Sequence, residues 1–496
     1  MILENFPALV IAVPLLAAFA VNLLGRLSRA WIAPLVLGSL AFSTIASVML
    51  LTRVLREGTV RYVVGGWRAP FGIELVVDPL SGLMLVVVAA VALVACVSVV
   101  KNVEQELPGK DHLFFTLLLI LIAGLLGLVV TGDAFNLYVL LEITSITTYG
   151  LIAMGPDRAP LSSFNYIIMG TIGACFYLLG VGYLYILTGS LNMADIALIL
   201  PGLEGQVAVA TAFAFLLVGF WVKMAFFPLH SWLPNAYSHA PNSVAVVVAP
   251  LMTKVTVYLM LRIILTVFSV DYAFYQHAAV QSTIVWVAAG AIVCASFLAL
   301  AQRDLKRMLT YIIVAEVGYM VGGAWLANSA GMTGAVLHIV NDALMTLCMF
   351  LAVLAIVCRI GDTRFENLTG IFRRMPITMA AFTLGAFSMI GVPPTCGFFS
   401  KWYLILGGVE AGQWGFVIAL VVSSLVNAVL FFRIIEIGYF RLEEQDHAAV
   451  HGNGVAEAPL MILSPLVLTA LALLVVGFGS GLIVNDVIRL ALPAGF

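Results

Sequence analysis

Charged residues are scarce in this chain. Asp, Glu, Lys and Arg make up 10% of its 496 residues, whereas hydrophobic residues make up 63%. A water-soluble domain carries about 25% charged residues, so the composition excludes an ordinary soluble globular protein. The net charge is −2, without a basic tail or basic cluster, so nucleic-acid binding is not expected either.

Paired cysteines and catalytic motifs are also missing. No CxxC pair, P-loop, dinucleotide-binding glycine motif, HExxH or Ser-His-Asp pattern is present. We therefore expect no cofactor, no metal and no catalytic centre in this chain, although it can still be a transporter subunit of a redox-driven enzyme. The six cysteines stand singly in apolar segments, as small hydrophobic residues do: Cys96, Cys175, Cys294, Cys348, Cys358 and Cys396.

Long apolar runs fill most of the chain. Runs of roughly 18 or more apolar residues are typical of transmembrane helices, and the alternation of a membrane β-barrel is absent. We expect an all-α integral membrane protein with a short β-hairpin at 53–78, where "YVVGGWRAPFGIELVVD" lies. The sequence predicts about fourteen spans: 6–24, 31–52, 79–100, 112–131, 134–154, 162–188, 206–227, 243–267, 279–301, 309–327, 331–357, 377–399, 411–438 and 459–488.

The distribution of Lys and Arg predicts an orientation. Most of these residues fall in the loops after odd-numbered spans, and cytoplasmic loops carry an excess of Lys and Arg. We therefore expect a multi-pass protein of the cell inner membrane with both termini on the outer side. Four residues before the third span run against this assignment: Arg53, Arg56, Arg61 and Arg68.

Two of the spans contain proline breaks. Pro228 interrupts span 7 in "GFWVKMAFFPLHSWLP", and Pro393 and Pro394 interrupt span 12 in "MIGVPPTCGFFSKW". Proline removes an amide donor, and a membrane helix tolerates such a break only where protein or water satisfies the freed carbonyls. Two broken helices in corresponding halves indicate a transporter built from inverted repeats.

Ionisable residues within the spans follow the same repeat. The first set is Glu142, Lys223 and Lys254, and the second, five spans later, is Glu316, Lys401 and Arg433. The separations are 81 and 31 residues in the first set and 85 and 32 in the second. Because five crossings are an odd number, the two copies must be inverted. We expect four parts: 1–111 with helices 1–3 and a periplasmic hairpin, 112–267 with helices 4–8, 279–440 with helices 9–13, and 459–496 with helix 14.

These buried charges suggest a proton relay. A charge at the bilayer centre costs ~2.5–3.5 kcal/mol on insertion scales, and both lysine and glutamate can change protonation state when desolvated. Arginine is a poor carrier because it keeps its proton, so Arg433 fits a structural or electrostatic role. Static ion pairs that lock helices together remain the alternative for Glu142, Lys223 and Lys254.

Three histidines extend the candidate site. His338 lies one helical turn before Asp342, on the same face, and is either a relay group or a satisfied buried polar residue. His230 and His239 flank the loop "HSWLPNAYSHAP". They fit proton entry or gating, or are ordinary surface histidines, and no third ligand supports a metal site.

Six stretches carry a resemblance to a known family. They are "GGWRAPFGIELVVDPLSGLM", "TGDAFNLYVLLEITSITTYGL", "TGSLNMADIA", "KMAFFPLHSWLPNAYSHAPNSVAVVVAPLMTKVTVYLMLR", "QRDLKRMLTY" and "MIGVPPTCGFFSKW". The chain resembles the antiporter-like subunits of Mrp-type cation/proton antiporters, respiratory complex I and membrane-bound hydrogenases, and most of all the D subunit of the Mrp type. The resemblance implies a fourteen-helix core, a Glu142–Lys223 pair, Lys254 as the next relay group, His338 on the central axis and Lys401 as the terminal lysine.

The sequence departs from this family at two positions. Members commonly read Asn-His-Ala-x-x-Lys in span 11, where this chain has Asn341-Asp342-Ala343-Leu344-Met345-Thr346, and a lysine is frequent where Asn165 stands. Either Asp342 and His338 carry the proton together with water, or the relay is interrupted.

Two functions follow as expectations. The first is an ion-translocating subunit, for protons with sodium as a second candidate, in a complex with related antiporter-like and small Mrp-type subunits. The second is a coupling or structural module of a membrane-bound hydrogenase or another ferredoxin- or quinone-linked oxidoreductase, next to hydrogenase-like or iron–sulfur subunits.

Overall fold

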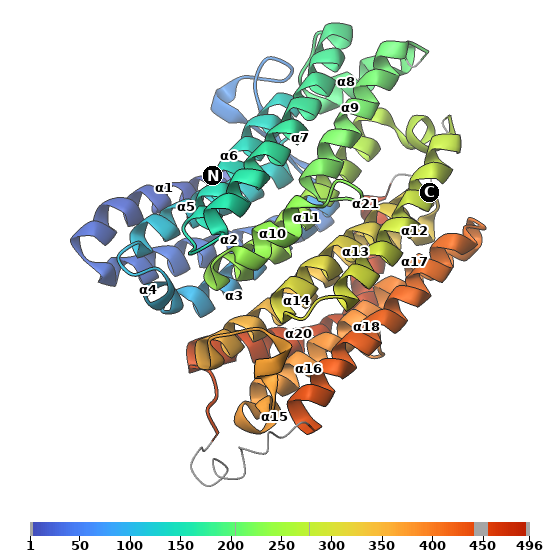
Figure 1. The fold of residues 1–496 in the computed structure, drawn as a ribbon. Helices are drawn as coiled ribbons and strands as arrows, with labels where there is room; N and C mark the ends of the chain where they lie inside the picture. The colour runs from blue at the N-terminus through green and yellow to red at the C-terminus, as the bar shows by residue number, and fades with distance from the viewer. Residues whose placement is uncertain (1–2, 204, 277, 441–454, 493–496) are drawn as a thin grey trace.

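The chain folds into a bundle of long helices with one small β-hairpin (Figure 1). The computed structural model describes residues 3–203, 205–276, 278–440 and 455–492. Within these ranges, 12 helices are long and apolar enough to cross a membrane, which confirms an all-α integral membrane protein. They are α1 (Phe6–Leu27), α2 (Ile32–Glu57), α3 (Pro79–Val99), α5 (Asp111–Val130), α6 (Ala134–Ala153), α7 (Ala159–Thr188), α11 (Asn242–Ile263), α12 (Ala278–Leu300), α13 (Leu305–Trp325), α14 (Ser329–Ile360), α18 (Trp414–Phe440) and α20 (Leu460–Ile483).

The two spans predicted to be broken are shorter helices that end before their prolines. Span 7 is α9 (Val207–Lys223), followed by α10 (Trp232–His239), and span 12 is α16 (Pro376–Ile390), followed by α17 (Cys396–Glu410). Proline lacks the amide that would continue each helix. The count of fourteen spans depends on including α9 and α16, and both the count and the inverted repeats stay predictions. The remaining short helices are α4 (Asn102–Glu106), α8 (Met193–Ile199), α15 (Ile371–Arg374) and α21 (Arg489–Ala491).

Helices α11, α13 and α14 pack against one another inside the bundle. In an apolar 18-residue stretch of each membrane-length helix, 100% of α11, 94% of α13, 78% of α5 and 72% of both α3 and α14 is buried, against 28% of α1. Helix α14 packs against α11, α13, α16, α17 and α20, and α7 packs closely against α9. A helix surrounded by protein can carry ionisable groups that lipid would not tolerate, so these three helices are where a polar site is expected.

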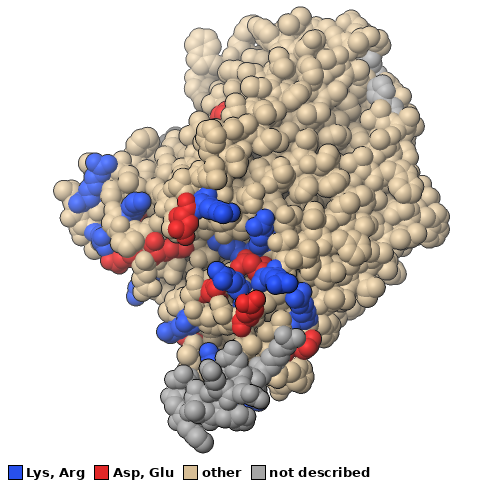
Figure 2. All heavy atoms as spheres, in the orientation of Figure 1, with Lys and Arg blue, Asp and Glu red and all other residues tan. Residues whose placement is uncertain are grey.

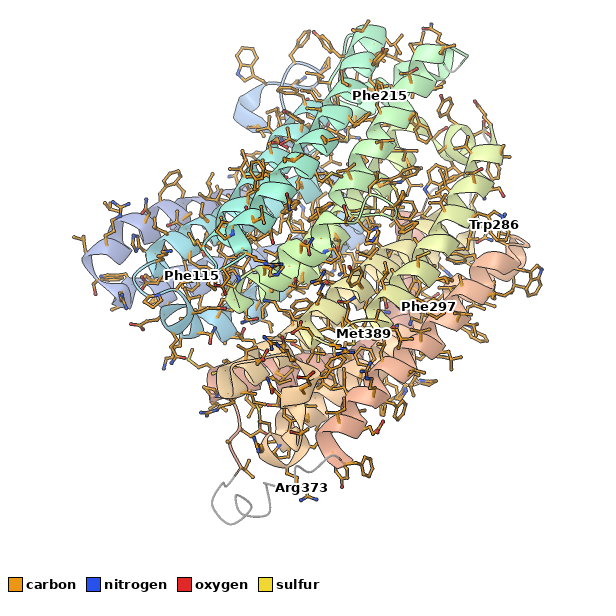
Figure 3. All side chains as sticks on the ribbon, in the orientation of Figure 1. Phe115, Phe215, Trp286, Phe297, Arg373 and Met389 are labelled. Carbon is orange, nitrogen blue, oxygen red and sulfur yellow. The ribbon has the colours of Figure 1, made fainter. Side chains whose placement is uncertain are left out.

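Charged side chains gather at one end of the molecule (Figure 2). This is the end where Figure 1 places α4 and α15, and Arg373 of α15 projects there in Figure 3. The rest of the visible face is almost free of charge. A charged end beside a broad apolar surface is what a protein embedded in a bilayer presents.

The hairpin lies between α2 and α3. Strands β1 (Val60–Val63) and β2 (Glu74–Val77) pair antiparallel, with Val60 opposite Val77. Arg53 and Arg61, two of the four arginines that oppose the predicted orientation, have carboxylate partners: Arg53 Nε lies 2.7 Å from Glu57, and Arg61 Nη1 lies 3.0 Å from Glu74. Their charge is therefore balanced locally.

An ion pair joins the hairpin to the interior helix α11. Asp78 caps the N-terminus of α3 by accepting the Ser81 N–H at 2.9 Å, and it forms an ion pair with Arg262 of α11. Burial alone would raise the pKa of Asp78, but the Arg262 guanidinium and the Ser81 N–H together hold it below its ordinary value. A depressed carboxyl pKa stabilises the fold above the unfolded pKa of ~3.9, so this clamp persists at neutral pH.

Candidate functional site

The first ion pair joins α6 to the end of α9 and is partly buried. Lys223 Nζ lies 3.1 Å from Glu142 Oε1 and donates a hydrogen bond of 2.7 Å to Ser145 Oγ. The Lys223 side chain is 4% exposed and that of Glu142 is 25% exposed. Lys223 is the last residue of α9, where the unpaired carbonyls of a helix C-terminus favour a cation. The structure thus brings together the first two residues singled out from the sequence.

A side chain hydrogen-bonds to a backbone carbonyl at the end of α9, where the helix breaks. Val222 O accepts a hydrogen bond of 3.0 Å from Trp232 Nε1, and the Trp232 ring stacks on Tyr166 with 3.9 Å between ring centroids. Pro228 is exposed and lies in the turn between α9 and α10. The aromatic pair therefore fixes where α9 stops and holds Lys223 at that point.

The second ion pair lies deeper, between α11 and α14. Lys254 Nζ is 2.9 Å from Asp342 Oδ2, and both side chains are at most 1% exposed. Thr346 bridges the pair: its hydroxyl accepts from Lys254 Nζ at 3.2 Å and donates to Asp342 Oδ1 at 2.8 Å. The residue that departs from the family pattern is therefore part of a hydrogen-bonded Lys–Asp–Thr cluster, so the axis is polar at this point.

A proline also interrupts the hydrogen bonding of the helix that carries Lys254. Pro250 lies inside α11, one turn before Lys254, and the ammonium donates to the Ala249 carbonyl at 3.3 Å. Proline has no amide for the carbonyl four residues earlier, which here is that of Val246. The Ala249 carbonyl that Lys254 contacts is therefore a neighbour of the freed group and not the freed group itself. Helix α11 continues through Pro250 from Asn242 to Ile263. The sequence interpretation did not include this proline, although it stands four residues before a lysine in an apolar span.

The third cluster joins α13, α14 and α17. His338 Nε2 lies 2.5 Å from Glu316 Oε2, and His338 Nδ1 lies 2.8 Å from Ser400 Oγ. Glu316 and His338 are completely buried. Glu316 therefore contacts the histidine, and no salt bridge joins it to Lys401, its counterpart in the second charge set, among the described residues. The Glu316–Lys401 separation along the chain is similar to that of Glu142 and Lys223, but Glu316 and Lys401 do not form the corresponding ion pair in the described residues.

Lys401 is held by carbonyls. Its Nζ donates to Met389 O at 2.6 Å and to Ile390 O at 3.4 Å, and it lies 5.0 Å from the centroid of the Tyr319 ring. These carbonyls stand at the end of α16, just before the Pro393–Pro394 break, and Met389, which is labelled in Figure 3, is buried. The second break therefore creates a cation site from the C-terminus of a helix.

Gly391 makes this site possible. It follows α16 with φ +93°, and a Cβ there would come within 3.1 Å of Lys401 Cδ. Only glycine adopts this left-handed conformation without strain. The break thus needs the glycine to turn the chain and to leave room for the lysine stem.

Two further buried hydrogen-bond acceptors lie beside the second and third clusters. Within the part of the chain that the structure describes, Glu316 Oε1 and Asn341 Oδ1 are buried without a hydrogen-bond partner. Buried polar atoms of this kind are ordinarily satisfied by ordered water. The region between the second and third clusters is therefore suited to hydration, which a proton path requires.

Three of the residues singled out from the sequence lie outside this axis. Arg433 is exposed, 5.3 Å from the centroid of the Phe365 ring, so it does not take the place in the second half that Lys254 has in the first. His230 stacks on Phe227 beside the first break, and His239 Nδ1 lies 3.0 Å from Ser162 Oγ. Among the described residues, no group of three His, Cys, Asp or Glu could hold a metal ion.

Two relatives cover most of the chain. The N subunit of the NADH-quinone oxidoreductase of Desulforudis audaxviator is 43% identical over 497 residues, covering 99% of both chains. The D subunit of the Na(+)/H(+) antiporter of Alkalihalophilus pseudofirmus is 31% identical over 425 residues, covering 85% of this chain and 84% of the relative. The resemblance to the Mrp-type D subunit seen in the sequence is real, and this N subunit is more similar still.

A solved structure shares the whole fold. A chain of the membrane-bound sulfane sulfur reductase, an archaeal respiratory membrane complex, superposes with a TM-score of 0.87 at 30% identity, covering 97% of this chain and 96% of that chain. The family model described as NADH:quinone oxidoreductase/Mrp antiporter, transmembrane, matches residues 131–427. That segment runs from α6 to α18 and contains all three buried clusters and Lys401. The chain belongs to the NADH:quinone oxidoreductase/Mrp antiporter transmembrane family.

Proposed function

We propose that this chain is an ion-translocating subunit of a multisubunit membrane complex and that it carries protons along its buried ionisable groups. The observation that carries the proposal is the succession of cation–acceptor contacts from α6 to α17. Two of them, Glu142–Lys223 and Lys254–Asp342, join helices that are distant in the chain. Each of the contacts contains a group that can gain or lose a proton. Such groups inside a membrane mark an ion pathway.

The first step depends on the Glu142–Lys223 pair. The carboxylate and the Ser145 hydroxyl stabilise the charged ammonium. Separating Glu142 from Lys223 withdraws that stabilisation and favours transfer of the lysine proton toward Lys254. A change of ~3 units in a pKa corresponds to a free energy of ~4 kcal/mol. Moving one charge across a membrane potential of ~180 mV requires a similar free energy. One ion pair that opens and closes is therefore adequate for energy coupling.

The crossing between the halves runs through the Lys254–Asp342–Thr346 cluster. Asp342 forms an ion pair with the Lys254 ammonium and accepts a hydrogen bond from the Thr346 hydroxyl. His338 lies one turn before Asp342 on α14. Water beside the unpaired oxygens of Asn341 and Glu316 would link this cluster to the His338–Glu316 pair. Lys401, held by helix-end carbonyls, is the terminal group.

Partners, coupling ion and orientation belong to the same proposal. The relatives and the structural neighbour are subunits of antiporters or respiratory membrane complexes, so related antiporter-like and small membrane subunits are the expected partners. Sodium is a second candidate ion, because the Alkalihalophilus pseudofirmus relative belongs by name to a Na(+)/H(+) antiporter. The charged end in Figure 2 would face the cytoplasm of an inner membrane, with both termini outside.

Glu142→Gln and Lys223→Ala test the relay in the assembled complex. Each variant removes one partner of the first pair, and we expect ion-driven pH changes in proteoliposomes to fall by ~10-fold or more. Glu57→Gln, which removes a carboxylate from an exposed pair, should leave the pH change unchanged. Undiminished activity of both site variants would reject the relay assignment.

A second candidate function is a coupling module within a redox-driven complex. The sulfane sulfur reductase neighbour favours it, because that complex is respiratory. The departure at Thr346 distinguishes the two candidates. Thr346→Lys would place a second ammonium beside Lys254, so loss of conduction supports the present cluster as the path, whereas a gain supports an interrupted channel. Co-purification of hydrogenase-like or iron–sulfur subunits would identify the redox complex.

A further inference from the structure

Arg433 lines a basic cavity that the proposed translocation path does not use. The cavity has a volume of about 380 Å³ and opens on the surface, lined by Arg303, Phe365, Glu366, Thr369, Arg433 and Ile437. These residues come from the loop after α12, from the 365–369 segment and from α18. Arg303 and Arg433 form no salt bridge among the described residues, although Glu366 lines the same cavity.

A rigid platform positions the two arginines. Asp304 and Arg364 form an antiparallel bridge, Phe365 N donates to Arg303 O at 3.0 Å, and Leu305 N donates to Thr363 O at 2.9 Å. Phe365 is buried, and its ring lies under the Arg433 guanidinium, 5.3 Å from Cζ. A cation above an aromatic face is held in place without losing its charge. The Arg433 guanidinium is therefore held over Phe365, and the backbone of Arg303 is hydrogen-bonded to the same segment.

The cavity lies near one end of two membrane-length helices, α12 and α18. Arg433 is seven residues before the end of α18, which is ~10 Å along the helix, and Arg303 follows the end of α12. Toward the bilayer, α12 and α18 pack together and expose apolar side chains. They include Phe297 of α12, which is labelled in Figure 3, and Val429 and Phe432 of α18, each at least 51% exposed.

We propose that this cavity binds the phosphate headgroup of an anionic phospholipid, with the acyl chains lying along the exposed faces of α12 and α18. Arginine is suited to phosphate because its planar guanidinium donates two parallel hydrogen bonds. Basic pockets between transmembrane helices commonly bind anionic headgroups. The adjoining apolar surface distinguishes a lipid from free phosphate, which would gain nothing from α12 and α18.

Lipid retention tests the proposal in the intact complex. Complexes purified from membranes containing phosphatidylglycerol and phosphatidylethanolamine would be analysed by native mass spectrometry for bound lipid. We expect the unmodified complex to retain phosphatidylglycerol selectively, and the Arg303→Gln/Arg433→Gln variant to retain about 10-fold less at that site. The matched control, Arg26→Gln/Arg373→Gln, removes two exposed arginines outside the cavity and should retain lipid as the unmodified complex does.

Three outcomes would overturn the proposal. The first is equal retention of phosphatidylglycerol by the Arg303/Arg433 variant and the control. The second is displacement of the lipid by millimolar inorganic phosphate, which would identify a free-anion site. The third is loss of a co-purifying protein subunit from the Arg303/Arg433 variant with lipid retention unchanged, which would identify a protein interface. None of these results depends on ion translocation, so the proposal can fail while the proposed function stands.

Discussion

Replacing Asp342 with asparagine is expected to reduce proton translocation by the assembled complex about 100-fold or more. Asp342 is completely buried and is the carboxylate partner of Lys254 at 2.9 Å. Removing one partner of a buried ion pair costs ~3–5 kcal/mol because the other charge is left uncompensated, and this corresponds to a factor of ~100 or more. The Lys254 ammonium would then have no carboxylate partner, and the path would be blocked at its centre. Proteoliposome pH measurements check the result.

Thr346→Val is the matched control for Asp342→Asn. Valine has nearly the same shape as threonine and removes only the hydroxyl that bridges Lys254 and Asp342. The ion pair stays, so translocation should fall only several-fold, in keeping with the loss of ~1–2 kcal/mol of hydrogen bonding. A drop as large as that of Asp342→Asn would contradict the assignment of the main role to the carboxylate.

Replacing Lys401 with methionine is expected to abolish translocation while leaving thermal stability unchanged or increased. Lys401 is buried, and its ammonium contacts carbonyls and an aromatic ring, with no carboxylate within salt-bridge distance in the described ranges. Holding such a charge inside a membrane is costly. Methionine has a similar length and no charge. The substitution should therefore stabilise the fold while it removes a group that translocation needs, a trade-off that is common at functional sites.

Two assays on the same preparation check the Lys401→Met prediction. Translocation is measured in proteoliposomes, and the thermal unfolding midpoint is measured in detergent by the loss of monodisperse protein. Leu404→Ala, which truncates a buried side chain of the same helix, should instead lower the midpoint, since large-to-small core changes cost ~2–5 kcal/mol. A Lys401→Met complex that is strongly destabilised would show that the lysine is a structural anchor.

The sequence was sufficient for the features that depend on one segment at a time. Apolar runs predicted the membrane helices, and Pro228, Pro393 and Pro394 predicted where α9 and α16 end. Both rest on local physics, namely the cost of a polar backbone in lipid and the missing proline amide. The family resemblance supplied the contact between Glu142 and Lys223.

The contacts between distant helices could not be predicted. Helical periodicity shows which residues share a face but not which helix that face meets. The sequence therefore predicts Asp342 as a possible relay group beside His338, but it does not predict the ion pair with Lys254. Chain spacing also suggested that Arg433 repeats Lys254, whereas the structure exposes Arg433 on Phe365. Three-dimensional packing decides both cases, because α14 lies against α11 whereas α18 packs mainly against α12.

The central claim is that buried lysines change their protonation state during turnover, and Lys223→Arg in proteoliposomes tests it most directly. Arginine keeps the positive charge opposite Glu142 and the hydrogen bonds of the pair, but it does not release its proton at physiological pH. The account predicts an assembled, stable complex whose ion-driven pH change is lost. A Lys223→Arg complex that transports as well as the unmodified one would show that the side chains at positions 142 and 223 form a static lock between helices, and would contradict the relay.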